Sequence, residues 1–224
     1  LAAPIAAYAV DRFAPAVAVA CAEPQIQVFA VPGGALLKSL PTPRAVRALA
    51  YSQDGKLFGA ATEDGFVTVW QTEGWERVAR IDANVGPAVW LGFSPDGSGV
   101  VSIGEDGYAR CWWLASPKKP QAAVKSHKGV LAAARLSPDG GLLAAAGEDH
   151  TVRLWERTTG KAVAALPARK DRVSAIAFAP NNRLLAVGSW DRTVLLWDRK
   201  EKSVVKELNP FAGGVLAVCF SRDG

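Results

Sequence analysis

The sequence has no hydrophobic run of the roughly 20 residues that a membrane-spanning helix needs, because a charged residue, a glycine or a proline interrupts every apolar stretch. This absence excludes a membrane span. Cysteine is scarce, and Cys21, Cys111 and Cys219 lie far apart, with no Cys-x-x-Cys pair among them. We interpret all three as buried thiols, an arrangement that argues against both a disulfide framework and a zinc cluster.

The charge balance is only mildly basic. Lys and Arg number 26 against 21 Asp and Glu, which gives a net charge of +5 and a pI near 9.2. The basic residues are scattered and never exceed two in a row. This pattern argues against a nucleic acid partner, which would favour a continuous basic track. Half of the residues are hydrophobic and 21% are charged, which is the composition of a folded protein.

Groups that could carry out catalysis are also few. The chain has two histidines, His127 and His150. The motifs Gly-x-x-x-x-Gly-Lys-Ser/Thr, His-Glu-x-x-His and Gly-x-Ser-x-Gly are all absent from the sequence. We therefore expect no catalytic residue, no metal site and no cofactor, and the sequence predicts a protein that is not an enzyme.

What the sequence does contain is a repeat. Trp70, Trp112, Trp155 and Trp197 are separated by 42, 43 and 42 residues, and an Asp precedes each of them by six positions. A turn motif keeps the same phase, from Tyr-Ser-Gln-Asp-Gly at 51–55 and Phe-Ser-Pro-Asp-Gly at 93–97 to Phe-Ser-Arg-Asp-Gly at 220–224. A fixed period between roughly 20 and 50 residues indicates a repeat architecture.

Each repeat divides into four short strands joined by turns. In the repeat that ends near residue 210, we expect strands at 173–178, 184–187, 193–197 and 203–208. Pro, Asp and Gly between these strands are typical turn residues, and no helical period is present. The sequence therefore predicts an all-β fold built from four-stranded meanders.

The two repeated motifs resemble those of the WD40 family of β-propellers over essentially the whole chain. The resemblance implies an all-β, WD40-type β-propeller with about five four-stranded blades plus the first strand of a sixth at 215–220. We expect a single incomplete propeller domain over 1–224, with repeats at approximately 1–41, 42–83, 84–125, 126–168 and 169–210 and the start of another at 211–224. Because WD40 propellers most often have more blades, we also expect further blades before residue 1, after residue 224, or both.

The resemblance also implies a hydrogen-bonded network in each blade, made by a His before the first strand, a Ser or Thr on the second, the Asp of the turn and the Trp of the third. In this chain the network is incomplete. The repeat with His127 has Ala145 at the Ser position, and the repeat with Ser102 has no His before its first strand. We expect His127 with Asp149 to make the firmest cap. The Asp and Trp positions are held by Asp64, Trp70, Asp106, Trp112, Asp149, Trp155, Asp191 and Trp197.

A Glu precedes the network Asp in three consecutive repeats, at Glu63, Glu105 and Glu148. In a propeller these turns open onto one face, so the row of carboxylates either contacts a partner or is simply solvated. Trp190 replaces the Glu in the next repeat, either as an interface anchor or as a residue packed against a neighbouring blade.

The loops that lead into the first strands bring cations to the same face. They are Arg44, Lys128, Arg169, Lys170 and Arg172. The mixed charge favours a protein or peptide partner over a nucleic acid. On the opposite face we interpret the basic residues as a solvated rim, which includes Lys118, Lys161, Lys200 and Lys202.

Two functions are consistent with these features. The first is a non-catalytic scaffold for protein–protein interactions that presents one propeller face to a peptide or protein. The second is a sensory or targeting propeller of a larger enzyme, such as a kinase or a redox protein, whose catalytic part lies outside this chain. We also expect self-association through open propeller edges. The composition favours a cytoplasmic location and leaves a periplasmic one open.

Overall fold

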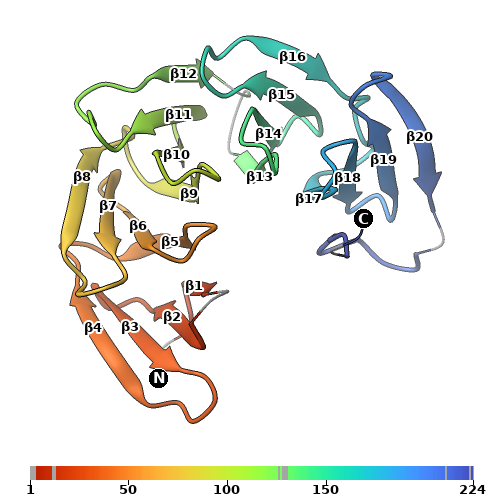
Figure 1. Ribbon diagram of the computed structural model, residues 1–224. Helices are drawn as coiled ribbons and strands as arrows, with labels where there is room; N and C mark the ends of the chain where they lie inside the picture. The colour runs from red at the N-terminus through yellow and green to blue at the C-terminus, as the bar shows by residue number, and fades with distance from the viewer. Residues whose placement is uncertain are drawn as a thin grey trace. The chain divides into compact units, whose positions relative to one another are not determined.

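The computed structural model describes residues 4–11, 14–125, 127, 131–209, 211–221 and 223. Over these residues it contains twenty strands in five antiparallel sheets of four (Figure 1). In every sheet the hydrogen-bonded neighbours are consecutive in the chain, so each sheet is a meander, and we call it a blade. The expected all-β fold is confirmed. Within the same residues, no helix has the length and hydrophobicity needed to cross a bilayer.

The contacts between residues divide the chain into two compact units, which we describe separately. Unit 1 is Leu1–Ala123 and unit 2 is Val124–Gly224. Blades 1 and 2 and most of blade 3 belong to unit 1, and blades 4 and 5 belong to unit 2. The single domain over 1–224 remains a prediction.

The strand boundaries follow the repeat. Blade 1 consists of β1 (Ala7–Val10), β2 (Ala16–Ala20), β3 (Gln25–Ala30) and β4 (Leu36–Pro41). Blade 2 consists of β5 (Val46–Tyr51), β6 (Leu57–Thr62), β7 (Phe66–Gln71) and β8 (Arg77–Asp82). Blade 3 consists of β9 (Ala88–Phe93), β10 (Gly99–Gly104), β11 (Tyr108–Trp113) and β12 (Ala122–Lys125).

Unit 2 repeats the same layout. Blade 4 consists of β13 (Leu131–Leu136), β14 (Leu142–Gly147), β15 (Val152–Glu156) and β16 (Ala162–Ala165). Blade 5 consists of β17 (Val173–Phe178), β18 (Leu184–Ser189), β19 (Val194–Asp198) and β20 (Ser203–Leu208).

The repeated Ser-x-Asp-Gly turn explains why the first and second strands of a blade pair. In blade 3 the Ser94 hydroxyl donates to Asp96 Oδ1 at 2.5 Å, and the Gly97 amide donates to the Ser94 carbonyl at 2.9 Å. Gly97 has a φ of +68°, a conformation that glycine adopts without steric cost. The turn therefore sets the register of β9 against β10.

The hydrophobic core lies between neighbouring blades of one unit. In unit 1, Ile26 and Val28 of blade 1 pack in one cluster with Val46 and Phe58 of blade 2, and all four side chains are buried. A second cluster joins blades 2 and 3, and a third joins blades 4 and 5 of unit 2. Neighbouring blades of one unit therefore bury apolar flanks against each other, as expected for a repeat protein.

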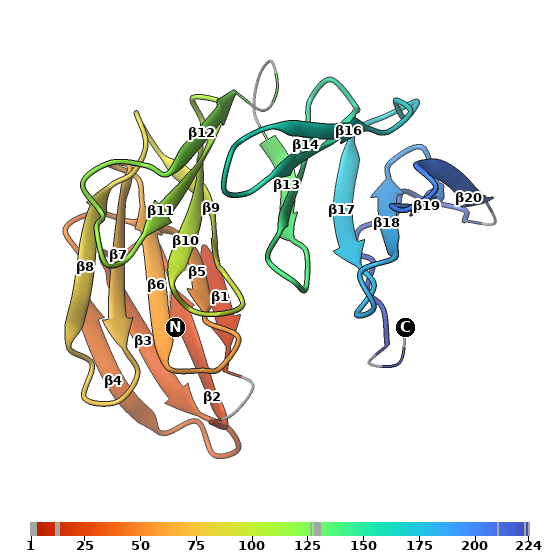
Figure 2. The same cartoon turned by 45° about the horizontal axis from the view of Figure 1, so that its top comes forward.

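The antiparallel meander also fixes which loops share an edge. The turn between the second and third strands of a blade lies at the same edge as the loop that leads into the first strand, and we call this edge the upper face of the blade. The turns between the first and second and between the third and fourth strands make the lower face. Figure 2 shows the strands of unit 1 side by side, with these turns at their two ends.

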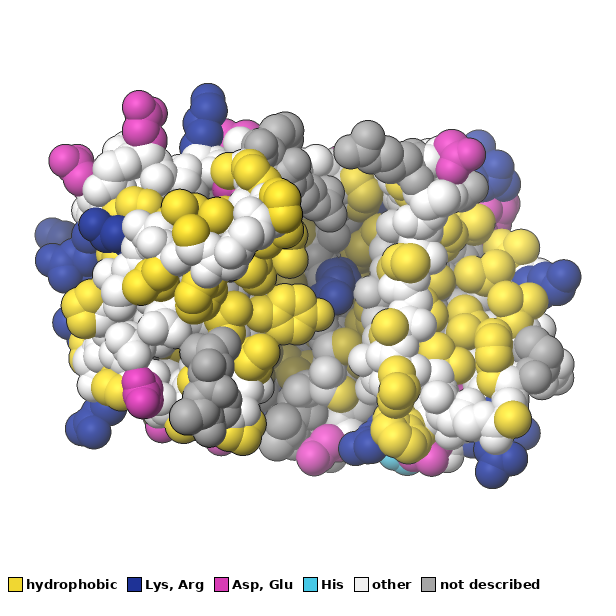
Figure 3. Space-filling model, turned by 90° about the horizontal axis from the view of Figure 1, so that it is seen from below, with side chains coloured by type: hydrophobic (Ala, Val, Ile, Leu, Met, Phe, Trp, Pro, Cys, Tyr) yellow, Lys and Arg dark blue, Asp and Glu magenta, His cyan; other side chains and the backbone are white. Residues whose placement is uncertain are grey.

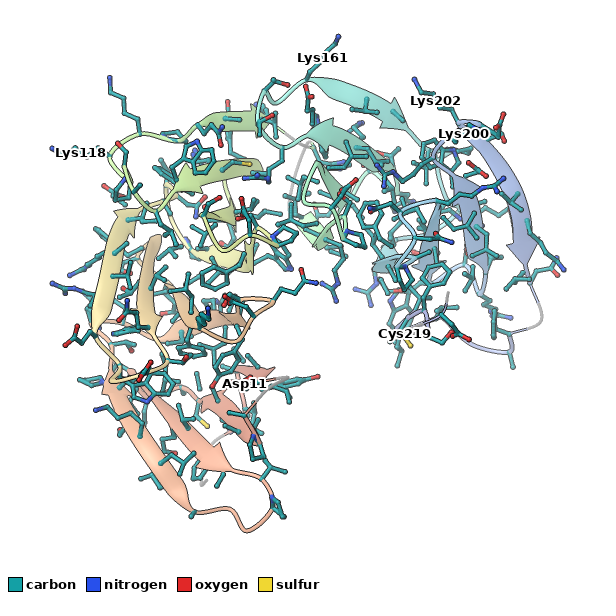
Figure 4. The ribbon with its side chains drawn as sticks, in the orientation of Figure 1. Asp11, Lys118, Lys161, Lys200, Lys202 and Cys219 are labelled. Carbon is teal, nitrogen blue, oxygen red and sulfur yellow. The ribbon has the colours of Figure 1, made fainter. Side chains whose placement is uncertain are left out.

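Two expectations need correction. Residues 215–220 form no strand: the Val215 amide donates to the Ser189 carbonyl at 3.0 Å, but the described residues offer the segment no partner strand for a ladder. An alternating apolar pattern is not sufficient without that partner. The thiols of Cys21 and Cys111 are buried as expected, but Cys219 is exposed, because it lies on this unpaired segment (Figure 4).

Candidate partner-binding face

The upper face of blade 4 holds the network around His127. Its Nε2 atom is 3.0 Å from the Ala145 carbonyl, which can only accept, so Nε2 carries a proton and donates. Its Nδ1 atom is 2.9 Å from Asp149 Oδ1 and 2.7 Å from a terminal nitrogen of Arg153. The ring also meets Trp155 edge-on, with centroids 5.9 Å apart. The backbone carbonyl of Ala145 thus takes the contact that a Ser side chain would make.

The two titratable groups of this network have shifted pKa values. Burial lowers the pKa of His127 below its usual 6.5, although Asp149 acts in the opposite direction. Burial raises the pKa of Asp149, but the hydrogen bond from the Thr151 hydroxyl and the contact with His127 outweigh that effect and bring its pKa down to about 2. Asp149 is therefore ionised at neutral pH, and Arg153 pairs with its second oxygen at 2.8 Å.

In blade 3, Asn84 occupies the position of His127, 43 residues earlier. Its Oδ1 accepts from Arg110 at 3.0 Å, and Arg110 also pairs with Asp106 at 2.8 Å. The Trp112 indole N–H donates to the Ser102 hydroxyl at 3.1 Å. The Nδ2 of Asn84 is buried and has no hydrogen-bond partner among the described residues. Blade 3 therefore holds the Ser, Asp and Trp contacts, while both N–H groups of the Asn84 amide lack a partner among the described residues.

Glycine makes these caps possible. A Cβ added at Gly147 would lie 2.5 Å from the His127 ring, and one added at Gly104 would lie 2.8 Å from Asn84. A larger residue at either position would force the capping side chain out of its place.

In blade 5 the same position is held by Arg169, 42 residues after His127. Its side chain is only 7% exposed and lies 3.2 Å from both Asp191 Oδ2 and Glu207 Oε1. It also donates to the Thr193 hydroxyl. Arg169 does not belong to the cations expected to reach the face, because Asp191 and Glu207 hold its side chain inside the blade. Burial raises the pKa of Asp191, but Thr193, the Lys170 amide and Arg169 lower it overall.

Blade 2 has the smallest network. The Thr62 hydroxyl donates to Asp64 Oδ1 at 2.5 Å. Trp70 is buried against Phe58, with ring centroids 6.0 Å apart. Trp197 of blade 5 is likewise buried in the core between blades 4 and 5.

On the upper face of unit 1, Glu63 and Glu105 share a single cation. The guanidinium of Arg47 lies 3.6 Å from a carboxylate oxygen of each, and all three side chains are close to half exposed. Such exposed pairs contribute little to stability, but they reduce the negative charge of this row. Arg47 could not be found from the repeat, because the equivalent residue in blade 5 is Ser174 and no cation recurs at this position.

On the upper face of unit 2, Trp190 is 40% exposed and the Arg172 guanidinium lies over its ring, 4.3 Å from the centroid. Glu148 of blade 4 is exposed, as is Arg44 of unit 1. Lys128 lies outside the described residues. On the lower face, Figure 4 shows Lys161, Lys200 and Lys202 projecting away from the strands.

The described residues contain no cluster of three or more His, Cys, Asp or Glu side chains arranged to hold a metal ion. In blades 3, 4 and 5, the buried residues Ser102, His127 and Arg169 bond to groups of their own blade. Their geometry caps the blades, and the charged and aromatic groups that remain exposed are suited to contact another macromolecule.

Comparison with known proteins identifies the repeat. The sequence model of the family described as "WD domain, G-beta repeat" matches residues 34–71, 118–156 and 160–198, which together are more than half of the chain. The chain belongs to the WD40-repeat family. This membership confirms the expected WD40-type propeller of about five blades. WD40-repeat proteins are generally interaction scaffolds without catalytic activity.

Individual relatives match parts of the chain. The chain is 32% identical over 81 residues to "p21-activated protein kinase-interacting protein 1-like" of Gallus gallus. This match covers 36% of the chain and 21% of that protein. The chain is 29% identical over 134 residues to "WD repeat-containing protein 1-A" of Xenopus laevis. This match covers 56% of this chain and 22% of that protein. "WD repeat-containing protein 1" of Xenopus tropicalis is 30% identical over 134 residues, with the same coverage. The chain spans about a fifth of the length of these relatives.

Proposed function

We propose that this chain is a non-catalytic scaffold that presents the upper faces of its blades to a protein or peptide partner. The observation that carries the proposal is the contrast between the two kinds of polar group on these faces. The network residues Ser102, His127 and Arg169 are buried and bond to other groups of their own blade. By contrast, exposed groups remain on Glu63, Glu105, Glu148, Arg44, Arg172 and Trp190. An exposed tryptophan beside mixed charges is typical of an interaction surface.

The relatives support a protein partner. The name of the Gallus gallus protein describes it as interacting with a p21-activated protein kinase. The free thiols of Cys21, Cys111 and Cys219 support a cytoplasmic location, since cysteines of extracellular proteins are usually oxidised to disulfides.

Affinity capture from a cell lysate tests the site. We expect a variant with Glu63→Ala, Glu105→Ala, Glu148→Ala and Trp190→Ala to lose partners that the wild-type chain retains. A matched lower-face variant, with Lys118→Ala, Lys161→Ala, Lys200→Ala and Lys202→Ala, should retain them. If the upper-face variant captures every wild-type partner at wild-type levels, the assignment of the upper face is wrong.

The alternative, a sensory or targeting propeller of a larger enzyme, uses the same faces. The small share of each relative that the chain covers is compatible with it. The complete reading frame distinguishes the two functions, because a catalytic motif outside this chain would support the alternative.

We also propose self-association through the flank of blade 5. An apolar groove of about 500 Å³ lies between this flank and the segment 211–220. Ala186, Val194, Leu196 and Leu208 line it from the blade, and Phe211, Val215 and Phe220 are among the residues that line it from the segment. The corresponding residues of blade 1, which lie 168 positions earlier, are buried against blade 2, and they are Ala18, Ile26, Val28 and Leu40. The shared chemistry suggests that the groove accepts a β-sheet flank.

The occupant we propose is blade 1 of a second copy. Ile5, Tyr8 and Val10 expose more than half of their surface on that blade. Figure 3, in which hydrophobic side chains are yellow, shows many of them at the surface on one side of the chain. Light scattering over a concentration series should show association that Leu196→Asp abolishes and Lys200→Asp preserves. A monomer at every concentration would contradict the proposal.

A further inference from the structure

Trp190 and Arg172 form a preorganised pair on the upper face of blade 5. The guanidinium lies 4.3 Å from the ring centroid, a distance at which a cation is attracted to an aromatic face. The indole also lies against Gly214, where an added Cβ would come within 2.8 Å of the ring. Two neighbours therefore fix the ring, while 40% of the residue stays exposed.

The contact with the ring leaves the N–H groups of Arg172 available for a ligand. The planar fork of a guanidinium matches the two oxygens of a carboxylate. Among the residues that the structure describes, no carboxylate lies within ion-pair distance of the Arg172 side chain. The Asp171 carboxylate accepts from the Arg172 backbone amide at 2.7 Å.

The charge around this pair is predominantly positive. Lys170, Arg172 and Arg192 are exposed, and in the described part of the chain none of them is in an ion pair. Asp171 is the exposed carboxylate of the same two loops, 167–172 and 190–193. The other nearby acids, Asp191 and Glu207, are held by Arg169. These two loops therefore carry three exposed cations and one exposed anion, Asp171.

Unit 1 differs at the equivalent positions. Glu63 and Glu105 stand where Trp190 stands in blade 5, and Arg47 pairs with both. The combination of an exposed aromatic ring with unpaired cations thus belongs to blade 5 and distinguishes it from blades 2 and 3.

We propose that the upper face of blade 5 binds an acidic peptide segment, with a Glu or Asp carboxylate on Arg172 and an apolar side chain on Trp190. Lys170 and Arg192 add long-range attraction for further carboxylates. This inference rests on the proposed function and names the chemistry of the partner at that site.

The test uses fluorescence anisotropy with a labelled peptide of alternating Glu and Leu. The comparison peptide has Gln in place of every Glu. We expect the full chain to bind the Glu peptide at least about tenfold more tightly, since one charge-assisted hydrogen-bonded pair has an effect of that order. Added salt should weaken the binding.

Variants assign the binding to the pair. Arg172→Gln should weaken binding of the Glu peptide about tenfold, and Arg172→Lys should also weaken it, because Lys lacks the planar fork. Lys161→Gln removes the same charge from the lower face and should leave affinity unchanged. Trp190→Ala should lose binding, while Trp113→Ala, at a similarly exposed tryptophan, should retain it. Circular dichroism melts confirm that each variant is folded.

Three results would overturn the proposal. The first is no binding of the Glu peptide by the wild-type chain. The second is equal weakening by Arg172→Gln and Lys161→Gln, which would indicate nonspecific attraction. The third is a single-stranded oligonucleotide that binds as tightly as the peptide through Arg172. If the peptide fails but the upper-face variant still loses its partners in affinity capture, the scaffold function stands and only the acidic partner is wrong.

Discussion

Replacing Arg169 with Met should strongly destabilise unit 2. The Arg169 side chain is 7% exposed and compensates Asp191, whose side chain is 3% exposed. Removing one partner of a buried ion pair leaves an uncompensated charge, which costs about 3–5 kcal/mol. Glu207 contributes less to this cost, because its side chain is 45% exposed and water can replace the lost contact.

Urea unfolding followed by tryptophan fluorescence measures this effect. Arg47→Met is the matched control, because Arg47 also pairs with two carboxylates but is 44% exposed, and its loss should cost no more than about 1 kcal/mol. The double variant Arg169→Met with Asp191→Asn should recover much of the loss, because it removes the stranded charge. The cost of Arg169→Met should also shrink as the pH falls and the unpaired Asp191 takes up a proton, because protonation removes the stranded charge.

Two results would refute this reasoning. If Arg169→Met costs no more than Arg47→Met, the guanidinium is solvated and does not cap blade 5. If the double variant is less stable than Arg169→Met alone, the carboxylate of Asp191 stabilises the blade without Arg169.

Three further predictions concern the other blades. Asn84→His should raise the free energy of unfolding by about 1 kcal/mol and the melting temperature by about 2–4 °C. The change gives blade 3, which already has Ser102, a His at the position that His127 holds in blade 4. Phe58→Ala should lower the free energy of unfolding by about 3–5 kcal/mol in the same urea assay, because it opens a cavity in the core between blades 1 and 2. Stability should fall as the pH drops below 6.5, because the pKa of buried His127 is lowered and the unfolded chain therefore binds the proton first. Stability should fall again below pH 3.8, because the pKa of Asp149 is also lower in the folded chain than in the unfolded chain. Melts of His127→Gln should lack the first of these two falls.

The backbone was largely predictable because it follows the period. The expected strands at 173–178 and 203–208 coincide with β17 and β20, and those at 184–187 and 193–197 lie within two residues of β18 and β19. Turn residues and apolar runs act locally, so their spacing in the sequence carries the layout of each blade. The segment 215–220 was mispredicted because a strand depends on a partner that a local pattern does not reveal.

The side-chain networks were less predictable. The period would have pointed to Asn84 and Arg169, since they lie 43 residues before and 42 residues after His127. Nothing in the period indicates that Glu207 on β20 reaches Arg169, or that Arg47 lies between Glu63 and Glu105. These contacts depend on side-chain reach across strands and blades, which only the folded arrangement determines.

The most direct test of the scaffold function is site-specific crosslinking on the two faces of unit 2. A photoreactive phenylalanine analogue would replace Arg192 on the upper face in one protein and Lys161 on the lower face in another. After irradiation in a cell lysate, we expect partner adducts from position 192 and few from position 161. Adducts in equal yield from both positions, or from position 161 alone, would contradict the account.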